Sequence, residues 1–276
     1  MPSASLHTHH VAAGAGRSAR RFRVWTPAGY TTDPTHRYPV LYLQDGQNVF
    51  DGDSAFAGVG WELGATAQRL VDQQKIPPLL LVGIDNAGAH RTEDYTPVPW
   101  RGRGGHAAEL ADVLVEAIKP FVDRHYRTRP DAEHTAIAGS SLGGLFALHT
   151  GLRRPDVFGH IAALSPSVFW GDGHLLRLLA MLTHRLPVRI WIDAGKRETA
   201  NVRDGARRLA ELLLGKGWQK HRTARRATLR HVEVAGGRHD ERSWGRRFDR
   251  VLKFLFPLPS APAKRRRSKP RRPATG

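Results

Sequence analysis

The sequence predicts an α/β fold in which helices cover both faces of a mostly parallel sheet. From Arg21 onward, short apolar runs rich in leucine or β-branched residues alternate with longer stretches of helical periodicity. This is the pattern of strands joined by crossover helices. Several of the runs are almost continuously apolar, as expected of strands buried on both faces. A length of 276 residues with 40% hydrophobic content suits one large domain of this kind.

The candidate strands are the apolar runs themselves. They fall at residues 22–26, 40–44, 79–85, 135–140, 161–165, 189–193 and 229–234. Between them lie segments whose length and apolar spacing suit helices. These segments are residues 61–74, 105–126, 142–153, 174–184, 202–217 and 240–256.

The segment 105–126 has the clearest helical periodicity. Its apolar residues recur at i, i+3, i+4, i+7, i+8 and i+11, which places them on one helical stripe and predicts packing on the sheet. They are Leu110, Val113, Leu114, Ala117, Ile118 and Phe121. Pro120 lies inside this stripe. Because proline lacks a backbone donor, we expect a kink or a helix boundary there.

The two ends of the chain differ from the body at residues 21–257, which contains no linker that would divide it. Residues 1–20 are mostly small, polar or basic and include His7, His9 and His10, which have no carboxylate nearby. We therefore predict a loose arm without a metal site. Residues 258–276 carry seven Lys and Arg and no acidic residue, which predicts a disordered basic tail.

Composition excludes several classes of protein. The absence of cysteine rules out disulfides, thiolate zinc sites, iron–sulfur clusters and a cysteine nucleophile. The first residues lack the apolar core of a secretory signal, and no apolar stretch approaches the ~20 residues that cross a bilayer. We therefore expect a cytoplasmic protein without a membrane span. The formal net charge of +18 bears on solubility and on non-specific partners rather than on the fold.

A candidate nucleophile lies between a predicted strand and a predicted helix. Residues 139–143 read Gly-Ser-Ser-Leu-Gly, so Gly139 and Gly143 bracket Ser141 in the pattern Gly-x-Ser-x-Gly. In a nucleophile elbow, a sharp strand-to-helix turn exposes the serine hydroxyl, and small residues on either side let the strand and helix pass closely. Ser141 is therefore the candidate nucleophile.

A serine hydroxyl needs a histidine base, and that histidine needs a carboxylate to orient it. His239 follows the last predicted strand, where a loop can point it over the sheet. The acid is expected after the preceding strand, where Asp193 and Glu198 compete. Residue type and position do not decide between these two carboxylates.

An oxyanion hole needs two backbone N–H groups aimed at the developing negative charge. One is expected from Leu142, the residue after the candidate nucleophile. The other is expected from the loop after the strand 40–44, where Gly46 permits close backbone approach. Gly46 or Gln47 is the predicted second donor.

From about Arg21 to Phe256 the sequence resembles the serine esterases related to enterochelin (siderophore) esterases and to esterase D. The resemblance is carried by residues 38–51, 91–97, 138–145, 164–167 and 237–244. It implies the α/β-hydrolase fold without a large cap domain, and ester cleavage through an acyl-enzyme. It also assigns Ser141 as nucleophile, His239 as base and Glu198 as acid, at a position where many members of the family have Asp.

Residues on the predicted rim are candidates for substrate contact. Trp61 and Trp170 could meet an apolar or aryl acyl group, as could Trp100 and Phe169. Arg91 could meet an anionic substrate, as could Arg101. Core packing and simple solvation are the alternatives for these side chains.

The first functional hypothesis is a serine-dependent carboxylic ester hydrolase that acts on a small-molecule ester. An acyltransferase with the same Ser-His-acid site is the alternative, because the nucleophile elbow is shared by both. A more remote alternative is an inactive hydrolase scaffold that contacts polyanions weakly through its basic tail. We find no His or carboxylate cluster with metal-ligand spacing, so no metal or other cofactor is predicted. The acyl and alcohol parts of the substrate and the oligomeric state do not follow from the sequence.

Overall fold

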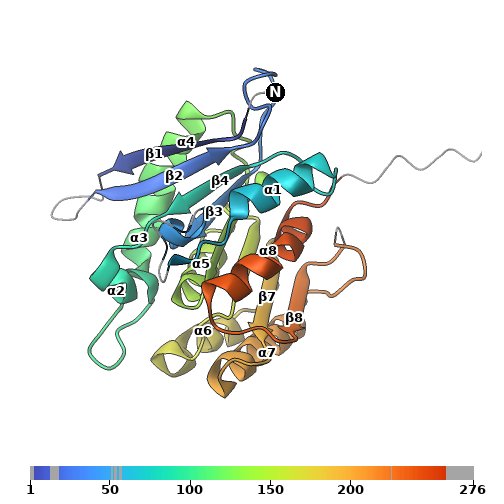
Figure 1. The fold of residues 1–276 in the computed structure, drawn as a ribbon. Helices are drawn as coiled ribbons and strands as arrows, with labels where there is room; N and C mark the ends of the chain where they lie inside the picture. Colours follow the sequence, from blue (N-terminus) through green and yellow to red (C-terminus); the bar gives the residue numbers. More distant parts are fainter. Residues whose placement is uncertain are drawn as a thin grey trace, which may run out of the picture.

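An eight-stranded sheet forms the centre of the molecule (Figure 1). This computed structural model describes residues 3–12, 19–50, 52, 55, 58–224 and 226–258. The strands are Ser5–Val11 (β1), Arg20–Thr26 (β2), Val40–Gln44 (β3), Leu80–Ile84 (β4), Thr135–Ser140 (β5), His160–Leu164 (β6), Arg189–Gly195 (β7) and Leu229–Val234 (β8). They lie in the order β1-β2-β4-β3-β5-β6-β7-β8. The pairs β1–β2 and β2–β4 are antiparallel and the other neighbouring pairs are parallel, which confirms a mostly parallel sheet.

The prediction of a loose arm over residues 1–20 is wrong for the segment that forms β1. This strand pairs with β2 along its whole length, from Ser5 opposite Thr26 to Val11 opposite Arg20. His9 anchors it, because its Nε2 lies 2.6 Å from the hydroxyl of Tyr126 and its ring lies 5.4 Å from that of Phe22. An edge strand can be held by backbone hydrogen bonds and few buried side chains, so it leaves little hydrophobic signal in the sequence.

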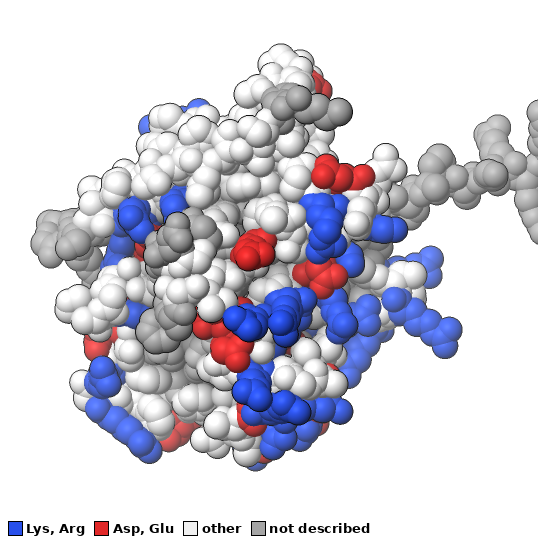
Figure 2. All heavy atoms as spheres, in the orientation of Figure 1, with Lys and Arg blue, Asp and Glu red and all other residues white. Residues whose placement is uncertain are grey.

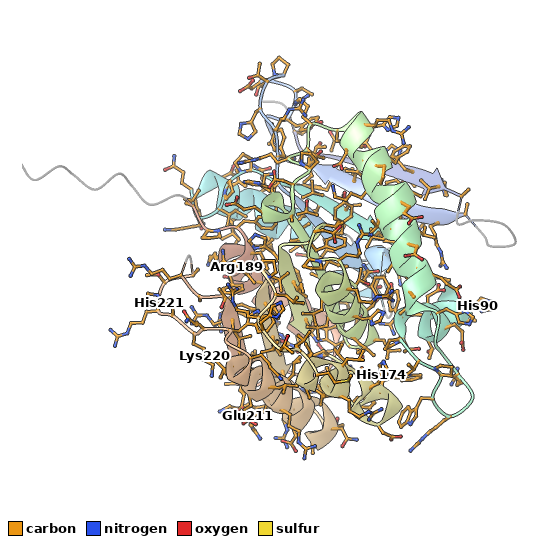
Figure 3. The ribbon with its side chains drawn as sticks, turned by 180° about the vertical axis from the view of Figure 1, so that it is seen from behind. His90, His174, Arg189, Glu211, Lys220 and His221 are labelled. Atoms are coloured by element: carbon orange, nitrogen blue, oxygen red, sulfur yellow. The ribbon has the colours of Figure 1, made fainter. Side chains whose placement is uncertain are left out.

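Helices cover both faces of the sheet, as the sequence predicts. They are Leu63–Asp72 (α1), Arg91–Tyr95 (α2), Ala107–Val113 (α3), Lys119–His125 (α4), Leu142–Arg153 (α5), Trp170–Ala180 (α6), Ala200–Gly215 (α7) and Glu241–Leu255 (α8). The short α2 was not predicted. In Figure 1, α1 and α8 lie in front of the sheet, and in the rear view of Figure 3 the helices from α3 to α6 lie in front of it.

Alternate side chains of one central strand serve the two faces. Val40 and Tyr42 of β3 belong to the buried cluster under α3 and α5. Leu41 and Leu43 belong to the other buried cluster, together with residues of α1 and α8. All four are at most 1% exposed. Burial on both faces explains why these strands read as continuous apolar runs.

The predicted helix at 105–126 is interrupted near Pro120. Residues Leu114–Ile118 form a π-helical turn between α3 and α4, and Pro120 lies in the first turn of α4. Because Pro120 has no N–H to donate to the carbonyl of residue 116, the regular hydrogen-bond ladder cannot continue, and the wider turn absorbs the break.

The carboxyl ends of the parallel strands meet at one edge of the sheet. Chain segments that follow β3, β5, β6, β7 and β8 therefore converge there. The last helix of the described chain is α8, which ends at Leu255. Pro259–Gly276, which make up almost all of the predicted basic tail, lie outside the described residues. Among the described helices, each is too short or too polar to cross a membrane.

Candidate active site

Ser141 occupies a strained turn between β5 and α5. Its backbone has φ 55° and ψ −120°, a conformation that few residues other than glycine adopt. A Cβ atom added to Gly139 would lie 2.4 Å from the carbonyl carbon of Gly143, so the strand and the helix pass too closely for any larger residue at position 139. The geometry thus confirms the steric reason for the flanking glycines.

His239 lies between the candidate nucleophile and a candidate acid. Its Nε2 is 2.9 Å from Ser141 Oγ, and its Nδ1 is 3.1 Å from Glu198 Oε2. The imidazole also packs edge-on against the ring of Trp244, with centroids 4.9 Å apart. The structure therefore brings together three side chains that are as much as 98 residues apart in the sequence.

Glu198 is the carboxylate that reaches His239, and its side chain is fully buried. Its Oε1 accepts hydrogen bonds from Ser165 Oγ at 2.7 Å and from the backbone N–H of Gly195 at 2.9 Å. Burial by itself would raise the pKa of Glu198, but the hydrogen bonds from His239, Ser165 and Gly195 outweigh it and lower the pKa from its ordinary value. The carboxylate is therefore held in its charged form.

Asp193, the competing acid, has other partners. Its Oδ2 accepts a hydrogen bond from Trp191 Nε1 at 2.8 Å, and its Oδ1 lies 2.8 Å from Arg247 Nη2. Its side chain has no exposed surface, and burial raises its pKa despite the nearby guanidinium of Arg247. Asp193 is thus a buried ion-pair partner beneath the site, while Glu198 is the acid that contacts the histidine.

A polar network that the sequence reasoning missed supports Glu198. The hydroxyl of Ser165 donates to Glu198 and accepts from Trp244 Nε1 at 3.0 Å and from Arg247 Nη2 at 2.7 Å. Ser165 itself has a positive φ of 47°. The available signal was the family resemblance, because Ser165 and Trp244 lie inside two of the matching segments. Arg247 follows at the same face of α8.

The loop after β3 lies against the first turn of α5. A Cβ on Gly143 would lie 3.1 Å from Asp45 Oδ2, which places this loop beside Ser141. Gly46 begins a short helical turn and Leu142 begins α5. The first N–H groups of a helical turn have no acceptor within it, so these two residues can direct backbone donors toward the site. Gln47 follows Gly46, and its Oε1 accepts from the N–H of Asn86 at 3.2 Å.

Arg91 has a different partner from the one predicted. Its Nε and Nη2 donate to the two carboxylate oxygens of Asp45 at 2.7 Å and 2.8 Å, and its guanidinium lies over the ring of Tyr95. Asn86 Nδ2 also donates to Asp45, at 2.6 Å. The structure therefore gives Arg91 a role in anchoring the loop that carries Gly46, in place of the predicted contact with an anionic substrate.

The predicted aromatic contacts divide into two groups. Trp61 is 3% exposed and packs against Phe248 with ring centroids 5.5 Å apart, so the prediction that it contacts substrate is wrong. It precedes α1 and fills the space beneath α8. Trp170 is only partly buried, and its ring lies 5.3 Å from that of Trp100. The ring of Phe169 lies 6.4 Å from that of Trp100, so these three partly buried rings form one aromatic cluster.

Other histidines after Ser141 bind elsewhere. His149 Nε2 faces Arg153, and His160 Nε2 lies 2.8 Å from the carbonyl of Glu133. His221 pairs with Thr223 in the loop before β8, and Figure 3 shows His221 and His174 on different parts of the rear face. Among the described histidines, His239 is the one whose ring nitrogen lies within hydrogen-bonding distance of the hydroxyl of Ser141.

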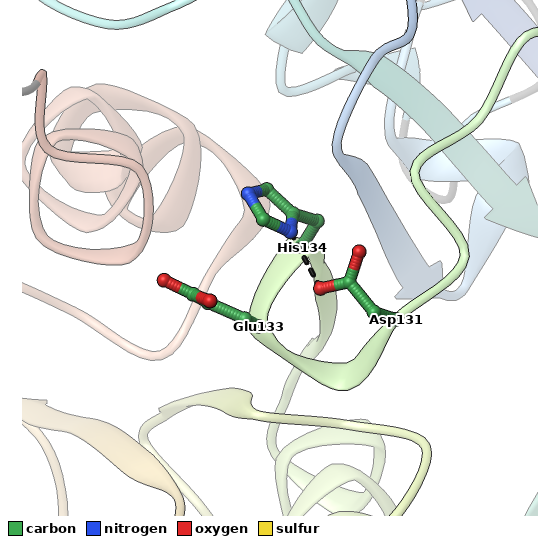
Figure 4. Close-up of side chains that lie close together, drawn as sticks. All are labelled: Asp131, Glu133 and His134. Carbon is green, nitrogen blue, oxygen red and sulfur yellow. Dashed lines mark hydrogen bonds and ion pairs between the residues drawn. The ribbon is translucent and has the colours of Figure 1, made fainter.

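One group of possible metal ligands was not predicted from the sequence. Asp131, Glu133 and His134 precede β5 at the opposite end of that strand from Ser141, with ligand atoms within 4.8 Å of one another (Figure 4). His134 Nδ1 lies 2.5 Å from Asp131 Oδ1. Asp131 and Glu133 are exposed, and the hydrogen bond between Asp131 and His134 accounts for the proximity of those two side chains. We assign no metal to this group.

Comparisons with known proteins identify the family of this chain. Residues 15–255 match the family model described as "Putative esterase". Ferri-bacillibactin esterase BesA of Bacillus subtilis (strain 168) is 30% identical over 219 residues, which cover 70% of this chain and 73% of that protein. Iron(III) enterobactin esterase of Escherichia coli (strain K12) is 29% identical over 205 residues, which cover 71% of this chain and 46% of that protein.

Solved structures show the same fold. An IroE-like serine hydrolase from Shewanella oneidensis superimposes with a TM-score of 0.74 at 19% identity, covering 91% of this chain and 80% of that one. The enterobactin esterase FES from Shigella flexneri gives a TM-score of 0.73 at 22% identity, covering 92% of this chain and 59% of that one. The chain therefore belongs to the esterase family that the matching model describes, which is related to the siderophore esterases, and it has the α/β fold of those solved structures.

Proposed function

We propose that this protein hydrolyses carboxylic esters through an acyl-enzyme formed on Ser141. The observation that carries the proposal is the unbroken chain of contacts from Ser141 Oγ to His239 Nε2, at 2.9 Å, and from His239 Nδ1 to Glu198 Oε2, at 3.1 Å. These distances are within the range required of a nucleophile, its general base and the group that orients the base.

In the first step, Ser141 Oγ attacks the ester carbonyl carbon while its proton passes to His239 Nε2. The charged carboxylate of Glu198 keeps the proton of His239 on Nδ1 and stabilises the imidazolium that forms. The backbone N–H groups of Leu142 and of Gly46 or Gln47 stabilise the oxyanion, each at about 3 kcal/mol. Collapse of the tetrahedral intermediate breaks the ester C–O bond, and His239 gives its proton to the departing alcohol.

In the second step, a water gives a proton to His239 and its oxygen attacks the acyl carbon. Collapse of this second intermediate returns the proton to Ser141 Oγ and releases the carboxylic acid. The His239 side chain is 36% exposed, so water from the solvent can reach it and serve as the acyl acceptor. Acyl transfer to an added alcohol, measured by product analysis, is the outcome that would favour the acyltransferase alternative.

The test is a Ser141→Ala variant assayed with p-nitrophenyl acetate. Loss of the nucleophile should lower kcat by about 10⁴-fold or more, and should also abolish covalent labelling by a fluorophosphonate probe detected by mass spectrometry. Hydrolysis at the wild-type rate by this variant would overturn the proposal. A panel of acetyl, feruloyl and siderophore lactone esters then identifies the substrate class. Siderophore lactones are included because two relatives are named as esterases of ferri-bacillibactin and of iron(III) enterobactin.

A further inference from the structure

A hollow of about 530 Å³ is lined by the residues on both sides of His239 in the chain, Arg238 and Asp240, and by four arginines in all. Arg197 comes from the segment after β7, Arg238 from the loop before α8, and Arg242 and Arg246 from α8 itself. Two of these residues are the direct neighbours of Glu198 and His239 in the chain. In Figure 2, basic side chains gather over the part of the surface that α8 occupies in Figure 1.

These four arginines have no partners of their own among the described residues. All four are exposed, and no hydrogen bond or ion pair of their guanidinium groups is found within the described part of the chain. Some exposed arginines elsewhere are paired, since Arg154 lies 2.7 Å from Asp156 and Arg207 lies 2.7 Å from Glu233. Others, such as Arg208, have no ion pair among the described residues, so what distinguishes these four arginines is that they line one hollow together.

The carboxylates in the wall of the hollow are engaged elsewhere. Asp240 accepts a hydrogen bond from the N–H of Ser243 at 2.7 Å and so caps α8. Glu241 accepts from Asn48 Nδ2 at 3.1 Å. Both donors are neutral, so the two acids keep their charges and the wall holds four arginines against two carboxylates. The remaining excess of positive charge would stabilise an anion from outside.

The position of the hollow indicates which part of a substrate it would meet. A general acid must contact the oxygen of the departing alcohol, and His239 is that acid in the proposed mechanism. Arg197 and Arg238 are the chain neighbours of Glu198 and His239 and line the hollow, whereas Asp45 and Gly46 of the predicted oxyanion loop follow β3 and are not in its wall. Arg242 and Arg246 are one helical turn apart, about 6 Å along α8, so they can meet charges on separate groups.

We propose that this hollow binds the alcohol part of ester substrates in which that part carries two or more negative charges. The inference rests on the proposed ester hydrolysis and adds a substrate class to it. Carboxylate, phosphate, sulfonate and phenolate groups all supply such charges, since a guanidinium binds each of these oxyanions.

The test compares two acetyl esters that share one acyl-enzyme. The first is p-nitrophenyl acetate, whose alcohol part is neutral, and the second is the acetyl ester of hydroxypyrene trisulfonate, whose alcohol part carries three negative charges. The variant replaces three exposed arginines together: Arg197→Gln, Arg242→Gln and Arg246→Gln. We expect kcat/KM for the trisulfonate ester to fall about tenfold or more, and kcat/KM for the neutral ester to change less than twofold.

The matched control removes the same total charge from exposed arginines outside the hollow: Arg185→Gln, Arg208→Gln and Arg222→Gln. An equal loss in this control, or an unchanged ratio of the two kcat/KM values in the hollow variant, would overturn the inference. Raising the salt concentration from about 0.05 M to about 0.5 M should lower that ratio for the wild type.

A binding measurement separates this inference from the proposed function. Free hydroxypyrene trisulfonate is fluorescent, so its affinity for the wild type and for both triple variants can be measured without turnover. Weaker binding to the hollow variant alone supports the inference even if the protein cleaves neither ester. Equal binding to all three proteins overturns it even if Ser141→Ala shows that the proposed mechanism is right.

Discussion

Two buried carboxylates lie near Ser141, and their hydrogen-bond partners differ in charge. Asp45, on the loop after β3, is 2% exposed and is bound through both oxygens by the guanidinium of Arg91. Glu198, on the loop after β7, is bound by the neutral hydroxyl of Ser165, by the N–H of Gly195 and by His239. The closest cationic nitrogen of Arg247 is 3.5 Å away from Glu198.

This difference separates a structural carboxylate from one suited to catalysis. A guanidinium that neutralises Asp45 permanently fixes the backbone around it but leaves no charge for a reacting group. The direct hydrogen-bond donors to Glu198 Oε1 are neutral, and the guanidinium of Arg247 lies closer to Asp193 than to Glu198, so Glu198 keeps charge that can stabilise an imidazolium on His239. The burial of each carboxylate is similar, and the partners decide what each can do.

Of the substitutions that test this comparison, Glu198→Gln should lower kcat the most. Gln fills the same space but carries no charge to stabilise the imidazolium, so kcat for p-nitrophenyl acetate should fall about 10³- to 10⁴-fold with the fold intact. Circular dichroism and steady-state kinetics check both parts. Asp193→Asn is the matched control, because it neutralises the other carboxylate after β7. If it lowers kcat as much while Glu198→Gln does not, Asp193 is the acid.

Arg91→Gln should have a smaller effect on activity and a clear effect on stability. The change leaves Asp45 buried without its counter-ion, which should cost about 2–3 kcal/mol in the free energy of unfolding, and kcat/KM should fall about tenfold as the loop with Gly46 loosens. Urea denaturation and kinetics measure these effects. The double variant with Asp45→Asn should recover part of the lost stability. A raised KM for anionic esters with unchanged stability would instead restore the substrate contact predicted from the sequence.

The sequence predicted the residues whose roles depend on chain order and local geometry. Ser141, His239 and the pair Asp193/Glu198 lie at or after the carboxyl ends of parallel strands, so strand prediction alone placed them at one edge. The choice between the two acids required coordinates, because both lie near the end of β7 and only the fold reveals that Arg247 of α8 lies beside Asp193. The resemblance to a known family was the signal that favoured Glu198.

Other features depend on contacts between distant segments, which no local pattern encodes. The sequence suggests that Trp61 lies at the rim, but in the structure Trp61 packs against α8. The sequence likewise suggests that Arg91 is a free cation, but in the structure Arg91 binds Asp45. The strand β1 has almost no apolar pattern, and backbone pairing with β2 identifies it. Sequence reasoning was weakest where the partner of a residue comes from a different element.

Ser165→Ala should have the smallest effect on activity and a specific effect on the pH dependence of stability. The hydroxyl helps to hold the pKa of Glu198 below its ordinary value of about 4.5. Stabilisation from this group is complete above that ordinary pKa and is lost as the pH falls through the lowered one. Without the hydroxyl the pKa of Glu198 rises toward that ordinary value, so the stabilisation from this group is smaller and its loss on acidification is complete at a higher pH.

We expect kcat of Ser165→Ala to fall about threefold to tenfold, because Glu198 keeps its bond from Gly195 and its contact with His239. The free energy of unfolding measured between pH 7 and pH 3 should show the upward shift of the acid transition. Ser165→Gly is the matched variant, since it removes the same hydroxyl and adopts the φ of 47° without strain. An acid transition that moves in both variants comes from the lost hydrogen bond. One that moves only in Ser165→Ala comes from the backbone, and Ser165 then has no part in holding the charge of Glu198.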